Sequence, residues 1–109
     1  VANKSRNKVT IIQSIDRKMP FDDIAKNVEM THDELLYELN NIVDAGTKLN
    51  INYYIKDKVD EEIIDEIFGY FKGAPTDEID TAIRKLQDDD ISEEELLLTR
   101  IKFISDIAN

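Results

Sequence analysis

The stretch from Phe21 to Gly46 constrains the fold most, because it contains two helical segments separated by a very short turn. The turn falls at residues 28–30, and Thr31 then opens the second helix. Thr31 and Glu34 form a T-x-x-E capping box, in which the hydroxyl accepts a backbone N–H and the carboxylate accepts the Thr31 amide. Gly46 ends this helix, since glycine takes the left-handed conformation at low cost. The pattern predicts a helix-turn-helix, a shape that alone does not establish DNA binding.

The second helix has the wrong charge for reading bases. A helix in the major groove needs Arg, Lys, Asn or Gln at base edges and cations near phosphates. The residues predicted on its outer face are mostly acidic or neutral: His32, Asp33, Glu38, Asn40, Asn41 and Asp44. His32, the only histidine, is expected to be a solvated residue of the first turn rather than a catalytic base.

A helix over residues 4–18 precedes the motif. Val9, Ile12 and Ile15 are predicted on its inward stripe, with Ile11 beside them. Its outer face is the one basic element of the chain. The cations on that face are Lys4, Arg6, Lys8, Arg17 and Lys18.

After Gly46 the hydrophobic period changes from 3.6 to 2. Leu49, Ile51, Tyr53 and Ile55 alternate with polar residues, which predicts a half-buried strand over residues 48–55. A lone strand leaves its backbone groups unpaired. It would therefore form a small wing with residues 56–58, or pair with another copy or another domain.

Three further helices are expected. They are capped at Asp60, at Thr76 and at Ser92, the last with Glu95 as a second capping box. Gly73 is the predicted stop of the first. The final helix carries Leu96, Leu97, Ile101, Ile104 and Ile107 inward, and Leu98 and Phe103 off that stripe, so burial on more than one side is predicted.

These elements predict a mainly α fold with a helix-turn-helix or winged-helix-like core, one strand or small wing, and a three-helix extension at the C-terminal end. We expect one domain over residues 1–109, divided into the helix-turn-helix with its wing (1–58) and an acidic helical extension (59–109).

Charge is divided unevenly along the chain. Residues 1–59 hold nine acidic and nine basic side chains, whereas residues 60–109 hold fifteen and five, which gives the whole net charge of -10. Phosphate would be repelled over most of the surface, so any DNA contact must be local. The chain has no cysteine and no apolar run long enough to span a bilayer, which fits a cytoplasmic protein without a membrane partner.

Candidate nucleic-acid-binding residues lie in two places. One is the basic face of the first helix, and the other is the segment in which Tyr53 neighbours lysines, because aromatic rings stack on bases while cations meet phosphates. The alternative is that these rings are core and these charges are solvated. The complete set is Lys4, Arg6, Lys8, Arg17, Lys18, Lys48, Tyr53, Lys56 and Lys58.

The sequence offers no nucleotide-binding, hydrolase or zinc-protease motif. We therefore predict no catalytic residue, no metal site and no cofactor. The acidic runs at residues 88–90 and 93–95 lack the spacing of a calcium loop and fit a solvated turn and helix start.

Two runs carry a family resemblance: KSRNKVTIIQSIDRKMPFDDIAKNVEMTHDELLYELNNIVDAGTKLNINYYI and the later IDTAIRKLQDDDISEEELLLTRIKFI. They resemble the C-terminal helix-turn-helix module of RecQ-type ATP-dependent DNA helicases from Bacteroidetes-like bacteria. The resemblance implies an accessory domain of a parent enzyme that uses ATP and Mg²⁺ to unwind DNA in the 3′-to-5′ direction during recombination and repair. No helicase motif maps onto these residues, so no catalytic position is carried over.

Three functions follow. The first is an accessory module that helps to place DNA or a partner on the parent helicase. The second is a protein-interaction or dimerisation module, in which strand 48–55 pairs between copies and the acidic helices meet a basic surface. The third is a free-standing transcription regulator, which the charge of the second helix disfavours.

Overall fold

The computed structural model describes the backbone of residues 4–108 and the side chains of residues 7–107. Over that part of the chain the fold consists of seven α-helices and no strand. The helices are α1 (Lys4–Asp16), α2 (Phe21–Asn27), α3 (His32–Asp44), α4 (Asn52–Ile55), α5 (Glu61–Gly73), α6 (Ile79–Leu86) and α7 (Glu93–Phe103). A 3₁₀ turn (Gln87–Asp89) and a π-helical turn (Ile104–Ala108) follow α6 and α7. None of these described helices has the length and apolar character needed to cross a membrane.

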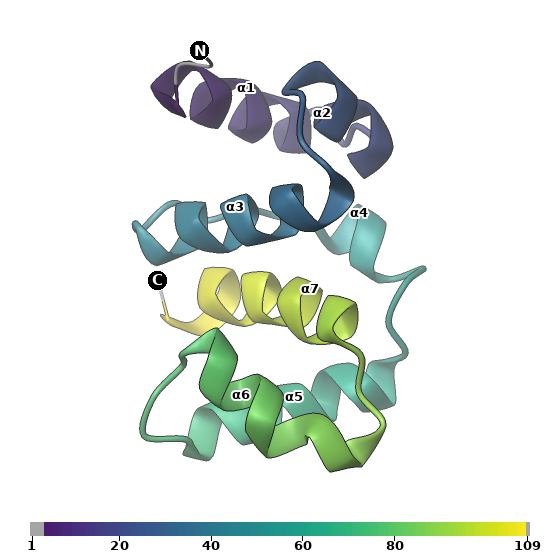
Figure 1. The fold of residues 1–109 in the computed structure, drawn as a ribbon, viewed down its shortest axis with the longest axis vertical. Coiled ribbons are helices and arrows are strands. Elements are labelled where there is room, and N and C mark those ends of the chain that lie inside the picture. Colours follow the sequence, from purple (N-terminus) through teal and green to yellow (C-terminus); the bar gives the residue numbers. More distant parts are fainter. Residues whose placement is uncertain (1–3, 109) are drawn as a thin grey trace.

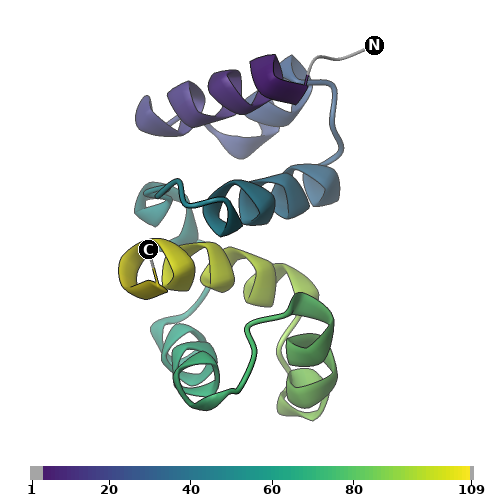
Figure 2. The same cartoon turned by 90° about the vertical axis from the view of Figure 1, so that its left-hand side faces the viewer.

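The helices stack in layers along the longest dimension of the molecule, 37 Å. Figure 1 shows α1 and α2 at one end, α3 below them, then α7, and finally α5 and α6 at the other end. The same order is visible after a quarter turn in Figure 2. A single continuous cluster of buried apolar residues connects all of these layers. The two central layers, α3 and α7, therefore hold the two ends of the fold together.

The helix-turn-helix predicted from the sequence is present. Thr31 Oγ1 accepts the Glu34 amide at 3.1 Å, and Glu34 Oε1 accepts the Thr31 amide at 2.8 Å, so the predicted capping box forms. Gly46 has a φ of 104°, and its amide donates to the Val43 carbonyl, which confirms the glycine stop. The turn between α2 and α3 places Glu29 in the left-handed conformation, with a φ of 58°.

The predicted strand at 48–55 is wrong, and with it the wing and the strand-mediated homodimer. Leu49, Ile51 and Ile55 are buried as expected, but the backbone turns into α4 instead of extending. Asn50 Oδ1 accepts the Asn52 amide at 3.1 Å, which starts the turn, and the Ile55 amide donates to the Ile51 carbonyl. One helical turn satisfies these backbone groups locally, whereas a lone strand would leave them unpaired.

Helix α1 is rotated relative to the prediction. Ile11 is fully buried and Ile15 nearly so, while Val9 is 52% exposed and Ile12 is half-buried. The buried face therefore follows an i, i+4 pair rather than the predicted stripe, and the buried Ser14 completes it by donating to the Thr10 carbonyl at 2.7 Å. The helix also ends at Asp16, two residues earlier than predicted.

The three C-terminal helices follow the prediction with local differences. Ser92 and Glu95 form the second capping box, and Leu98 and Phe103 are buried, which confirms that α7 is covered on more than one side. Helix α6 begins at Ile79 rather than after Thr76. Ile107, predicted to point inward, is 50% exposed because the π-helical turn that follows α7 changes the helical period.

Helix α5 also differs at its ends. Asp60 occupies the N-cap position, but its side chain makes no capping hydrogen bond. Gly73 is the last residue of the helix and does not have the positive φ expected of a glycine stop. The ends of α5 are therefore placed correctly, but they are not held by the predicted caps.

Candidate nucleic-acid interface

Helix α3 occupies the position of the reading helix in a helix-turn-helix, but α7 covers one of its faces. His32 Nε2 lies 2.6 Å from Glu94 Oε1, and the Tyr37 hydroxyl donates to the Glu93 carboxylate. The bonded partners advance from His32 with Glu94 at the start of both helices to Asp44 with Arg100 towards their ends, so α3 and α7 run parallel. His32 lies in the first turn of α3, as predicted, and its side chain is 30% exposed and paired with Glu94.

A buried polar network joins the far halves of the same two helices. Asn40 is completely buried, contrary to its predicted exposure, and its Nδ2 donates to the Leu36 carbonyl at 2.9 Å. Arg100 is 3% exposed and donates to Asn40 Oδ1 and to Asp44 Oδ1, each at 2.9 Å. Its Nε donates to the Asp77 carbonyl at 2.8 Å, which ties the loop before α6 to the pair. The face of α3 turned towards α7 is therefore fixed inside the protein.

The remaining exposed stripe of α3 is acidic or neutral. It comprises Asp33, Tyr37, Asn41 and Asp44, together with Glu34. The hydrogen bond to Glu93, followed by burial, raises the pKa of Tyr37 to about 12, so this phenol stays neutral near physiological pH. With no basic side chain on this stripe, α3 is unsuited to a major groove, as its sequence predicted.

A polar groove lies instead between the end of α1 and α4. Its volume is about 390 Å³. The residues that line it are Ile15, Asp16, Lys18, Asn50, Asn52, Tyr53 and Lys56. Lys18 reaches the groove because it adopts a φ of 59°, which ends α1. Its amide donates to the Ile15 carbonyl, and the Met19 amide donates to the Ser14 carbonyl, a Schellman arrangement that usually has glycine at the position of Lys18.

The wall of the groove is rigid at Tyr53. Its hydroxyl donates to the Met19 carbonyl at 2.6 Å, and its ring meets Phe21 edge to face, with 6.2 Å between centroids. Burial raises the pKa of Tyr53 to about 12. This phenol is therefore neutral near physiological pH, and its hydrogen bond joins α4 to the segment that follows α1.

Tyr54 faces the core rather than the groove. Its ring stacks on Phe21, with 3.8 Å between centroids and 2° between planes, and burial raises its pKa. The Lys58 ammonium lies 5.3 Å from the centre of the same ring. The Tyr54 ring therefore packs against Phe21 and Lys58. Of the two neighbouring tyrosines, Tyr53 is the one that borders the groove.

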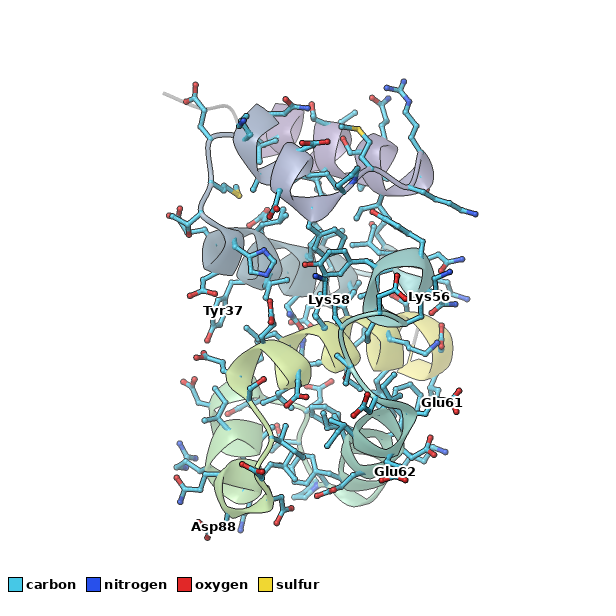
Figure 3. The ribbon with its side chains drawn as sticks, turned by 90° about the vertical axis from the view of Figure 1, so that its right-hand side faces the viewer. Tyr37, Lys56, Lys58, Glu61, Glu62 and Asp88 are labelled. Atoms are coloured by element: carbon cyan, nitrogen blue, oxygen red, sulfur yellow. The ribbon has the colours of Figure 1, made fainter. Side chains whose placement is uncertain are left out.

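Charge changes sign across this side of the molecule. Figure 3 shows Lys56 and Lys58 beside α4, with Glu61 and Glu62 of α5 next to them towards the acidic end. A polyanion on this side would be attracted near α4 and repelled near α5. Positive and negative side chains are therefore separated on this side of the molecule, in keeping with the uneven division of charge along the sequence.

Comparison with known families agrees with the observed helices. Residues 5–55 match the RecQ-1-like, helix-turn-helix domain, which begins in α1 and ends with α4. This segment is a RecQ-1-like helix-turn-helix. No curated protein matched the chain.

The predicted RecQ-type helix-turn-helix is thus confirmed over residues 5–55. The match covers α1 to α4, whereas the resemblance seen in the sequence extended further, to the final helices. Helices α5, α6 and α7 lie outside the matched segment; α7 packs against α3, and α5 and α6 pack against α7.

The RecQ-1-like segment brings together only part of the predicted site. Lys18, Tyr53 and Lys56 meet in the groove, whereas Lys58 lies over the Tyr54 ring and does not line it. The other predicted residues are dispersed: Lys8 is half-buried on α1, Arg17 is exposed at its end, and Lys48 is exposed between α3 and α4. The side chains of Lys4 and Arg6 lie outside the described residues.

Sequence reasoning missed two residues of the groove, Asn50 and Asn52. They were interpreted as the solvent side of a strand. A signal was present, because an asparagine side chain often accepts the backbone N–H two residues later and so starts a turn. The hydrogen bond from the Asn52 amide to Asn50 Oδ1 is this arrangement.

Proposed function

We propose that this chain is a non-catalytic accessory module of a RecQ-like 3′-to-5′ DNA helicase, which helps to place DNA during recombination and repair. ATP and Mg²⁺ would be used by helicase lobes elsewhere in the parent, in the cytoplasm. The match of residues 5–55 to the RecQ-1-like helix-turn-helix carries the proposal. DNA would be contacted on the side of α1 and α4, since α3 is acidic on its exposed stripe and covered by α7.

The proposal is tested by titrating the chain against single-stranded, duplex and forked DNA at two salt concentrations. Binding should weaken with salt, with a slope of about -0.7 per phosphate neutralised on a single strand. The triple variant Lys48→Ala, Lys56→Ala, Lys58→Ala should lose most of the affinity. A matched triple variant at Lys26, Lys72 and Lys85, which are exposed elsewhere, is the control. Equal losses in both variants, or no binding to any DNA at low salt, would refute DNA placement.

A second candidate function is contact with a basic protein surface on the parent helicase or a repair factor. A hollow of about 610 Å³ between α3 and the start of α6 favours it, because its rim is strongly acidic. The residues that line the hollow are Tyr37, Asp44, Asp77, Glu78, Ile79, Asp80 and Arg100.

Calorimetric titration of the chain against the separately purified helicase lobes distinguishes this candidate. Glu78→Gln with Asp80→Asn should weaken the complex while leaving DNA binding unchanged. The exposed pair Asp88 and Asp90, at the 3₁₀ turn that follows α6, gives a matched control when both are changed to asparagine. Unaltered affinity in the Glu78/Asp80 variant would exclude the hollow as the contact.

A further inference from the structure

We infer that the groove between α1 and α4 binds the phosphodiester backbone of a single DNA strand, and that the side-chain amides of Asn50 and Asn52 supply hydrogen-bond donors there. This inference rests on the proposed function and identifies which groups would make the contact. Neither the match to the family nor the charge pattern of the sequence identifies Asn50 and Asn52 as binding residues.

The orientation of both amides follows from their partners. Asn50 contacts a backbone N–H at 3.1 Å, so the atom facing that donor must be its oxygen. Asn52 lies 2.9 Å from the Lys102 ammonium, so the atom facing that cation must also be its oxygen. Both NH₂ groups are therefore left as donors, and neither has an acceptor among the described residues.

These amides join two cations at the same groove. Lys18 and Lys56 line it, and neither ammonium has a hydrogen-bonded or ion-paired partner within the part of the chain that the structure describes. Asp16 is the one carboxylate on the lining. The groove thus has two ammonium groups and two amide NH₂ groups as donors, and one carboxylate. This set favours an anionic ligand with several acceptor oxygens, such as a phosphate group.

A second hollow, of about 420 Å³, adjoins the groove beside α4 and shares Asn52 and Lys56 with it. Its lining also includes Asp60, Glu61 and Lys102, whereas Asp16 is the carboxylate on the lining of the groove itself. Because carboxylates repel anions, we expect a bound strand to place only one or two phosphates beside Lys18 and Lys56.

A single strand fits this arrangement better than a duplex. A duplex is stiff and carries a second phosphate backbone, which would approach the carboxylates of α5 beside the groove, such as Glu61 and Glu62 (Figure 3). A single strand is flexible and brings one backbone. Tyr53, held by its bond to Met19, borders the groove where a base of that strand would lie.

The test is an NMR titration of the whole chain with inorganic phosphate, a short single-stranded oligothymidine and a duplex of matched length. The side-chain NH₂ signals of Asn50 and Asn52 should shift and saturate with the single strand, weakly with phosphate, and least with the duplex. The salt slope for the single strand should be about -0.7 to -1.4, as expected for one or two phosphates.

Two isosteric substitutions, Asn50→Asp and Asn52→Asp, are the main variants. Each keeps the oxygen that makes the internal bond and replaces the free NH₂ by a carboxylate oxygen. Each should weaken single-strand binding at least about tenfold, because a hydrogen bond to a charged phosphate is lost and a negative charge is added beside it. Thermal unfolding should be unchanged, because the internal bonds remain.

Lys18→Gly should reduce binding while raising stability, since glycine favours the left-handed backbone of this position. Lys26→Ala removes an exposed lysine from α2, outside the groove, and should leave binding unchanged. Equal affinity of both Asp variants and the natural chain would overturn the inference while leaving DNA placement intact. Binding of phosphate without DNA would overturn the inference as well, and an absence of all DNA binding would refute the proposed function itself.

Discussion

Arg100→Met should destabilise the protein by about 1–4 kcal/mol, because this arginine is the link between α3, α7 and the loop before α6. Methionine retains most of the buried stem, so the loss comes from the guanidinium bonds. Asn40 Oδ1, completely buried, loses its donor, which costs about 1–3 kcal/mol. Asp44 is 44% exposed and returns to water, so its ion pair contributes only about 0–1 kcal/mol.

The loss is measurable by thermal and urea unfolding. A chain of 109 residues loses about 4 °C in Tm per kcal/mol, so the expected fall is about 4–16 °C. Arg84→Met is the matched control, because Arg84 is exposed on α6 and its Nη2 contacts only Thr81, at 3.4 Å; its effect should be under about 0.5 kcal/mol.

A double-mutant cycle identifies the source of the loss. In the Arg100→Met background, Asn40 Oδ1 is buried without a donor. Changing Asn40 to leucine removes this unsatisfied oxygen, so part of the stability should return. A coupling energy of at least about 1 kcal/mol between the two positions is expected. A single-variant loss under about 1 kcal/mol, or strict additivity, would show that the buried network does not hold α3 against α7.

Other features yield further predictions. Glu29→Gly should raise the free energy of unfolding by about 0.5–1 kcal/mol, since Glu29 has a φ of 58°; an unchanged urea midpoint would contradict this. Thr31→Ala and Ser92→Ala should each lower it by about 1 kcal/mol through loss of a capping box, as thermal unfolding would show, and an effect near zero would mean that water replaces the cap. Tyr53 has a pKa raised from about 10 to about 12, so its stabilising effect is complete below pH 10 and is lost as pH rises towards 12. Tyr53→Phe should remove one late-titrating phenol from an ultraviolet pH titration and flatten the alkaline fall in stability, and an unchanged titration curve would contradict the burial of this phenol.

Local signals in the sequence were sufficient for the helix-turn-helix. The capping boxes at Thr31 and Ser92 and the stop at Gly46 were predicted correctly, because each depends on residues within a few positions of one another. Such short-range chemistry does not change with the rest of the fold.

The segment at 48–55 shows where a short pattern becomes ambiguous. Leu49, Ile51 and Ile55 are buried in the structure, as a strand would require, yet the last two are also one helical turn apart. A short apolar run fits the period of a strand or that of a helix. The lack of a second strand to pair with segment 48–55 was the better indication of its structure.

The polar core could not be predicted. Asn40 and Arg100 have the composition of surface residues on amphipathic helices, and only their meeting across sixty positions makes them internal. The groove has the same origin, since Lys18 and Lys56 come together where the Tyr53 hydroxyl of α4 bonds the Met19 carbonyl after α1. Helical periodicity says which face of a helix is polar but not which polar residues will meet.

The parallel pairing of α3 and α7 also has a consequence for the order of folding. The bonds that join them connect residues 56 to 62 positions apart, so they form only after α7 has been synthesised. Until α7 packs against α3, one side of α3 is exposed to solvent. Closing so long a loop slows this packing step. A fragment cut at the edge of the matched segment, after residue 55, would lack that cover. We expect it to be aggregation-prone, so the unit that folds is longer than the unit that sequence comparison recognises.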